Sequence, residues 1–204
     1  MGLFGKKRIF KLSLVLAVLD PIPQRKKKCP SCGKDIYVRT NPFKGEKVLV
    51  NYTDALSIDA ISTLGITEKE YRAESEELAH KFKMATPFLS DIVWGIISRR
   101  QLDSVKRRDW NRAKMLYWEQ ARLLHQLGKG FFKVLQESAK CELYCYQAMG
   151  IKKAEISVAG GSSCIKCQSL DVKNFSITEA LEAMPIPVKD CENGFCRCLY
   201  SPTR

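Results

Sequence analysis

The chain has 204 residues, of which 45% are hydrophobic and 27% are charged, the composition of a soluble globular protein with one ordinary core or two small ones. The formal net charge is +12, but residues 1–50 hold 12 Lys or Arg against 3 Asp or Glu, which excludes a uniformly basic protein and indicates a basic N-terminal arm. The odd count of nine cysteines, in metal-type spacings, favours a reducing cytoplasm over a secreted disulfide framework.

Residues 1–11 are basic and residues 12–19 are apolar, an order that imitates a signal peptide. The apolar run is too short for a membrane span, and Asp20-Pro21 ends it without a cleavage motif, so the sequence predicts no span. We expect residues 12–19 to form a buried strand or short core helix. The alternative is a segment that lies on a membrane surface.

Residues 29–34 read Cys-Pro-Ser-Cys-Gly-Lys, which is typical of a zinc knuckle with Cys29 and Cys32 as ligands. Residues 36–40 and 47–50 are expected to pair as a hairpin, joined by a turn at 41–45. A knuckle followed by a hairpin resembles half of a zinc ribbon. A second CxxC does not follow at the usual spacing, so these two cysteines borrow ligands from elsewhere, share zinc across a dimer, or hold none.

The middle of the chain is predicted to be a helical bundle. A capping box at 67–70 opens a helix that ends near Met84, and Pro87 opens the next. Asp109 caps a third helix, Gly128 and Gly130 end it, and residues 131–149 form a fourth. Basic side chains on these helices and on the arm are the expected nucleic-acid contacts: Arg25, Lys26, Lys27, Lys28, Arg99, Arg100, Arg107 and Arg108.

Cys141 and Cys145 lie four residues apart on the fourth predicted helix and therefore share a face. They are possible additional metal ligands that could complete a site with Cys29 and Cys32. The alternative, which we favour, is that both are small buried core residues.

Five cysteines gather between residues 164 and 198. A CxxC pair followed by a second cysteine cluster within one small module is the pattern of a tetrahedral zinc site. The expected ligands are Cys164, Cys167, Cys191 and Cys196, with Cys198 as the substitute for either of the last two. The alternative is a set of free or buried cysteines without metal. A strand at 154–158 leads into this module, and Thr178 is expected to cap a short helix at 179–184.

The order CxxC, Phe175, Pro185-Ile-Pro187 and Cys196-Arg-Cys198 resembles the C-terminal module of phage head-morphogenesis proteins, the Mu F-like minor head proteins, over residues 154–200. That family usually has His where this chain has Cys191, and a cysteine there keeps zinc binding possible. The resemblance implies a structural role in head assembly, with other protein subunits as partners.

The expected fold class is α+β, mostly α: a helical bundle flanked by an N-terminal zinc-knuckle hairpin and a small C-terminal cysteine-rich zinc module. The expected segments are 1–28, 29–52, 53–150 and 151–204. The predicted function is that of a non-enzymatic zinc-binding interaction protein that binds nucleic acid without sequence preference. The alternatives are the phage structural role and a zinc-dependent hydrolase or nuclease that uses Glu182, which a closed four-cysteine site disfavours.

Overall fold

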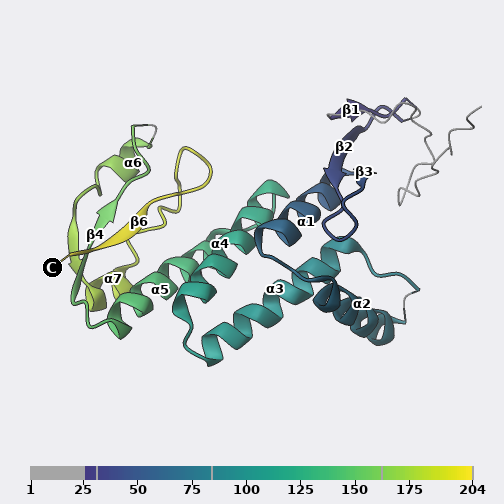
Figure 1. Cartoon of the computed structure of the whole chain (residues 1–204). Helices are drawn as coiled ribbons and strands as arrows, with labels where there is room; N and C mark the ends of the chain where they lie inside the picture. Colours follow the sequence, from purple (N-terminus) through teal and green to yellow (C-terminus); the bar gives the residue numbers. More distant parts are fainter. Residues whose placement is uncertain (1–25, 31, 84, 162, 204) are drawn as a thin grey trace, which may run out of the picture. The chain divides into compact units, whose positions relative to one another are not determined.

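The computed structural model describes residues 26–30, 32–83, 85–161 and 163–203. The chain forms two compact units, residues 1–96 and 97–204, and the division falls within helix α3 (Leu89–Lys106). Seven helices and two small antiparallel sheets lie in the described ranges, which confirms the α+β, mostly α class (Figure 1). The four segments expected from the sequence stay a prediction. No helix among the described residues is long and apolar enough to cross a membrane.

The first unit begins with a three-stranded sheet in the order β1-β2-β3, made of β1 (Lys27–Lys28), β2 (Asp35–Thr40) and β3 (Lys47–Val50). The predicted hairpin is confirmed. Its turn forms because the side-chain oxygen of Asn41 accepts hydrogen bonds from the backbone amides of Phe43 and Lys44, at 2.9 and 3.1 Å. Gly45 takes the left-handed conformation that closes the turn, with φ of +70°.

Helix α1 (Tyr52–Thr63) follows the hairpin directly. It lies in the segment 53–150 that was expected to be helical, although no separate helix was predicted at this place. Its signal is Asn51, whose side-chain oxygen accepts the backbone N–H of Asp54 at 2.8 Å as an N-cap. The helix buries Ile58 and Ile61, while Ile36 and Leu49 of the hairpin are buried as well. These side chains give the first unit its own small core.

Helix α2 (Glu68–Phe82) begins with the predicted capping box of Thr67 and Glu70. Helix α3 begins at Leu89, two residues after the predicted start at Pro87, because the carbonyl of Phe88 accepts the first helical amides. The two helices approach closely at Gly95, where an added Cβ would lie 2.0 Å from a carboxylate oxygen of Glu74. Only a glycine fits there without displacing the buried Glu74.

The second unit contains the helical hairpin of α4 (Trp110–Gln126) and α5 (Phe132–Ala148), which lie side by side (Figure 1). Asp109 caps α4 as predicted, accepting the backbone N–H of Arg112 at 3.2 Å. Gly128 ends it with φ of +67°. A side-chain hydrogen bond of 2.9 Å between Gln101 and Gln120 ties the last part of α3 to α4.

A second sheet in the order β5-β4-β6 lies beyond α5, built from β4 (Lys153–Ser157), β5 (Asn174–Ser176) and β6 (Leu199–Thr203). The predicted strand at 154–158 is β4. Two short helices, α6 (Ile165–Gln168) and α7 (Ile177–Ala183), complete the unit. The predicted cap Thr178 is wrong: the cap is Ser176, because Ser176 and Glu179 have the capping-box spacing and make both of its hydrogen bonds.

Candidate metal centre

Three segments bring five thiols together beside the second sheet. Cys164 caps the single turn of α6, so that Cys167 follows on the same turn. Cys191 lies in a tight turn closed by a hydrogen bond of 2.8 Å from the amide of Gly194 to the carbonyl of Cys191. Cys196 and Cys198 immediately precede β6. All five are reduced.

The sulfur atoms have the spacing of a metal site. The Sγ–Sγ distances from Cys164 to Cys191, from Cys167 to Cys191 and from Cys167 to Cys196 are each 3.8 Å. A regular tetrahedron of thiolates at about 2.3 Å from zinc has edges of about 3.8 Å. A disulfide would need about 2.05 Å. The cluster is therefore compatible with a common ion and contains no crosslink.

The five thiols form two triads that share one member. Cys164, Cys167 and Cys191 lie within 4.8 Å of one another, and so do Cys167, Cys196 and Cys198. Cys191 is half-buried and the other four are buried. Cys167 is thus the member common to both triads. The four predicted ligands do not form a single group within that distance, because Cys196 belongs to the second triad only, together with the predicted substitute Cys198.

Hydrogen bonds to sulfur lower the pKa of two of the five cysteines. The thiol of Cys198 and the backbone amides of Cys198 and Val188 lower the pKa of Cys196 to about 5. Backbone hydrogen bonds from Cys167 and Glu192 lower the pKa of Cys164. Amides that point at sulfur are what a structural thiolate site requires, because they offset negative charge in a buried place.

Burial and the donation of hydrogen bonds raise the pKa of the other three thiols. Burial raises the pKa of Cys167 and of Cys191, and the hydrogen bond that Cys198 donates to Cys196 raises its own pKa. Hydrogen bonding and burial therefore favour the thiolate form at Cys164 and Cys196 and disfavour it at the other three. A divalent ion would supply the positive charge that lets more of them ionise together.

The side chain of Phe195, directly before Cys196, packs against the helical hairpin of α4 and α5. Its ring lies 5.1 Å from Trp118, 5.2 Å from His125 and 5.2 Å from Phe131, measured between ring centroids. None of these four aromatic residues was predicted from the sequence to belong to the site. The available signal was an aromatic residue directly before Cys196.

The N-terminal knuckle has the expected local shape. The amide of Gly33 donates to the carbonyl of Cys29 at 2.8 Å, and Gly33 has φ of +68°. Cys29 is buried and Cys32 is exposed. Within the described part of the first unit, no cluster of three ligating side chains includes them. Their metal binding stays a prediction.

Cys141 and Cys145 lie on α5, in the second unit. Cys141 is buried and Cys145 is half-buried. Burial, with a contribution from Glu137, raises the pKa of Cys141 to about 11. A thiol with such a pKa is protonated at neutral pH, as the core-residue alternative expects. The shared site with Cys29 and Cys32 stays a prediction.

The predicted nucleic-acid contacts are distributed over both units. Arg25 lies outside the described residues, with the rest of the arm up to that point. Lys26 and Lys28 are exposed and both pair with Asp35, at 2.8 and 3.1 Å, while Lys27 is exposed. In the second unit, Arg100 is half-buried and three others are exposed: Arg99, Arg107 and Arg108.

Comparisons with protein-family profiles, with curated proteins and with solved structures found no match to this chain. The resemblance to phage head-morphogenesis proteins and the half zinc ribbon therefore stay predictions. The geometry of the cysteine cluster is the feature on which a functional proposal can be built.

Proposed function

We propose that the cysteine cluster of the second unit binds one zinc ion, which is structural, and that the protein is a non-enzymatic interaction protein. The observation that carries this is the set of three Sγ–Sγ distances of 3.8 Å that link Cys164, Cys191, Cys167 and Cys196. Thiolates favour zinc among the common divalent ions of the cytoplasm. Cys198 is the reserve ligand.

A structural role follows from the ligand chemistry. A catalytic zinc keeps one position for water, whereas four cysteine thiolates close the coordination shell. A fifth thiol next to the cluster would compete with water for any position that opened. Glu182, the carboxylate that a hydrolase would need, is exposed on α7 and belongs to neither thiol triad in the described residues. We therefore propose no reaction.

The ion would add a crosslink to segments that already contribute Ile177, Ala180 and Ile186 to the core of the second unit. Between α6 and β6 the chain has a three-residue strand, a seven-residue helix and loops. Ordering such a segment costs about 1–2 kcal/mol of backbone entropy per residue. The free energy of zinc binding would offset part of this entropy cost, so metal binding and folding of the module are expected to be coupled.

Nucleic acid is the partner that we propose. The net charge is +12, and four cations at the turn between α3 and α4 are exposed: Lys106, Arg107, Arg108 and Arg112. Cations without base-reading geometry bind phosphates and give affinity without sequence preference. The zinc module would then act as a scaffold for the basic surface of its unit.

Assembly with protein subunits of a phage head is the second candidate. It is supported by the way in which the residues of the resemblance meet: Ile186, from the Pro-Ile-Pro motif, lies in the same core cluster as the CxxC and Cys-Arg-Cys thiols. A subunit partner would bind through apolar contacts, so its affinity would be much less sensitive to salt than affinity for nucleic acid.

Metal content tests the zinc proposal. Protein purified under reducing conditions without a histidine tag should contain zinc, and Cys164→Ser with Cys167→Ser should lower the content by one ion per chain. The same change should expose residues 158–198 to protease. The matched control is Ile165→Ser with Lys166→Ser, two exposed positions inside the same CxxC. Unchanged metal and unchanged cleavage in the cysteine variant would overturn the assignment.

A further inference from the structure

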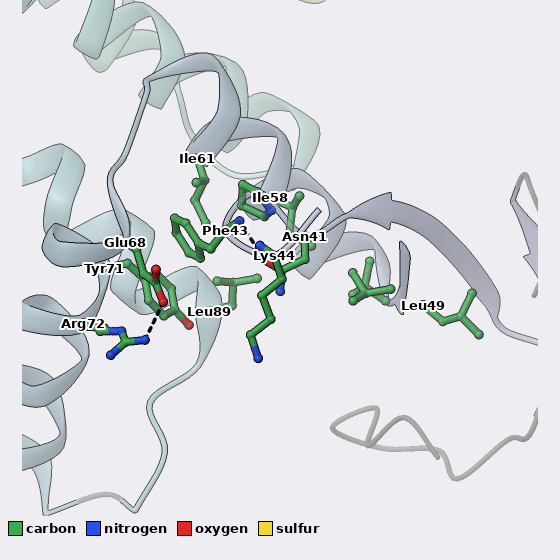
Figure 2. Close-up of a pocket in the computed structure, with 13 residues that line it drawn as sticks. Asn41, Phe43, Lys44, Leu49, Ile58, Ile61, Glu68, Tyr71, Arg72 and Leu89 are labelled. Carbon is green, nitrogen blue, oxygen red and sulfur yellow. Dashed lines mark hydrogen bonds and ion pairs between the residues drawn. The ribbon is translucent and has the colours of Figure 1, made fainter. Parts of the chain in front are cut away.

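The first unit contains an apolar groove at the turn end of its hairpin, with a volume of about 400 Å³ (Figure 2). Its inner wall is formed by three buried residues, Leu49 of β3 and Ile58 and Ile61 of α1. Val48 and Leu89 also line it. The groove lies entirely within residues 41–89 and does not involve the second unit.

Aromatic and charged groups also line the groove. The Phe43 and Tyr71 rings meet at 5.2 Å between centroids, and Arg72 is held by Glu68 at 2.6 Å. Figure 2 shows this ion pair as a dashed line. A cavity of about 150 Å³ lined by aliphatic residues accepts a benzene ring, so this groove has room for two or three apolar side chains. Its chemistry fits a short aliphatic segment.

The chain itself carries such a segment. Residues 12–19 read Leu-Ser-Leu-Val-Leu-Ala-Val-Leu, with no charge and one polar residue. They lie outside the described residues. An aliphatic run of this length on a soluble protein requires a cover, because exposed apolar patches associate.

The register of the first sheet directs the chain toward the groove. In the antiparallel pair β1-β2, Lys28 faces Asp35 and Lys27 faces Ile36. From Lys28 to Lys26 the chain therefore runs in the direction of Asn41, and the Lys26 ammonium lies 5.2 Å from the Tyr37 ring centroid. Asn41 is a groove residue.

The tether has a suitable length. Six residues, 20–25, separate the apolar run from Lys26. At about 3.3 Å per extended residue they span roughly 20 Å, whereas the four steps from Tyr37, opposite Lys26, to Asn41 cover about 13 Å. A short tether gives an effective concentration in the millimolar range, so even weak intrinsic affinity suffices.

We propose that residues 12–19 bind in the groove between the hairpin turn and helices α1, α2 and α3 of their own chain. The segment is then a built-in part of the first core.

Hydrogen–deuterium exchange on the full-length protein tests this. Leu14→Asp with Leu16→Asp should eject the segment and speed amide exchange in residues 41–50 and 58–72 by about tenfold or more, with a lower Tm. The control is Gln24→Asp, which adds a charge in the tether and should leave both unchanged. Val48→Asp or Leu89→Asp should produce the same exchange pattern from the groove side, and combining either with the segment variant should add little.

Three results would overturn the proposal. The first is equal exchange of the lining segments in the wild type and the Leu14/Leu16 variant. The second is protection that grows with protein concentration together with a dimer by sedimentation, which would show that a second copy covers the groove. The third is loss of binding to vesicles of anionic phospholipid in the segment variant without any change of groove exchange, which would assign residues 12–19 to a membrane surface. None of these depends on whether the second unit binds zinc.

Discussion

The carboxylate of Glu142 on α5 accepts a hydrogen bond of 3.0 Å from the backbone N–H of Tyr200 on β6. Its other oxygen binds the Lys114 ammonium at 3.0 Å. The hydroxyl of Tyr146, one turn further along α5, donates to the carbonyl of Tyr200 at 2.6 Å. Both backbone groups of Tyr200 are thus satisfied by side chains of one helix. Because Tyr200 follows Cys198 by two residues, these contacts fix the cysteine cluster on the helical hairpin.

Glu142→Ala should destabilise the second unit, because it leaves the Tyr200 amide unpaired in a buried place and Lys114 without its partner. The expected loss is about 1–3 kcal/mol in the free energy of unfolding. The control is Glu137→Ala on the same helix, which removes the partly exposed pair with Lys140 and should cost less than about 1 kcal/mol. Urea unfolding at constant zinc measures both. Equal midpoints for the two variants would show that the Glu142 contacts are dispensable.

Cys141→Ala with Cys145→Ala separates one zinc ion from two. If these cysteines are core residues, as the burial of Cys141 favours, zinc per chain should be unchanged and the free energy of unfolding should fall by about 1–2 kcal/mol. If they complete a site with Cys29 and Cys32, the double variant should lose one ion. Cys29 and Cys32 should then alkylate as fast as in unfolded protein. Metal analysis and mass spectrometry after alkylation distinguish these results.

Gly95→Ala should destabilise the first unit although alanine is the better helix former. The new Cβ would lie 2.0 Å from a carboxylate oxygen of Glu74 and 2.7 Å from the carbon that carries it. Because Glu74 is buried, its carboxylate would have to move within a packed region. Overpacking of this kind costs about 1–3 kcal/mol, against a gain of about 1 kcal/mol in helix propensity.

Combining Gly95→Ala with Glu74→Ala tests whether the collision explains the loss of stability. In a Glu74→Ala background the collision is absent, so Gly95→Ala should become stabilising there. Gly130→Ala, where an added Cβ has nothing within 4 Å, is the control and should be neutral or slightly stabilising. Thermal unfolding of the four variants forms the cycle. A loss at Gly95 that persists without the Glu74 side chain would contradict the collision.

Local sequence signals predicted much of this structure. The capping box at Thr67, the cap at Asp109 and the turn at Asn41 act over three or four residues, so their outcomes could be read from spacing. The cysteine spacing likewise predicted a cluster. Strand β6 was missed, because its residues are held by Glu142 and Tyr146, more than fifty positions earlier.

Long-range contacts account for the other omissions. Phe195 gains its importance from Trp118, His125 and Phe131, which only the fold brings to it. Glu142 reads as an ordinary helical glutamate until β6 lies against it. The membership of Cys198 in a triad with Cys167 also depends on how β6 enters the sheet. Spacing thus predicted that the cysteines would gather. The residues that hold the cluster in place, Phe195 and Glu142, could be identified only from the folded structure.

Salt dependence tests the nucleic-acid partner and distinguishes two basic surfaces. Each phosphate contact that is lost should reduce the slope of log affinity against log salt by about 0.7 to 0.9. One variant replaces four arm cations by glutamine: Lys6, Lys7, Arg8 and Lys11. The other replaces three at the turn between α3 and α4: Lys106, Arg107 and Arg108.

If both surfaces contact phosphates, the arm variant should lose more slope than the turn variant, and the two losses should add. Single-stranded and double-stranded DNA of mixed sequence, titrated at several salt concentrations, supply the slopes. The Lys26 and Lys28 ammonium groups are left in place because Asp35 already compensates them and their removal would disturb β1. A wild-type slope near zero would exclude phosphate contacts and favour a protein subunit as the partner. A slope that only the turn variant reduces would assign binding to the second unit alone.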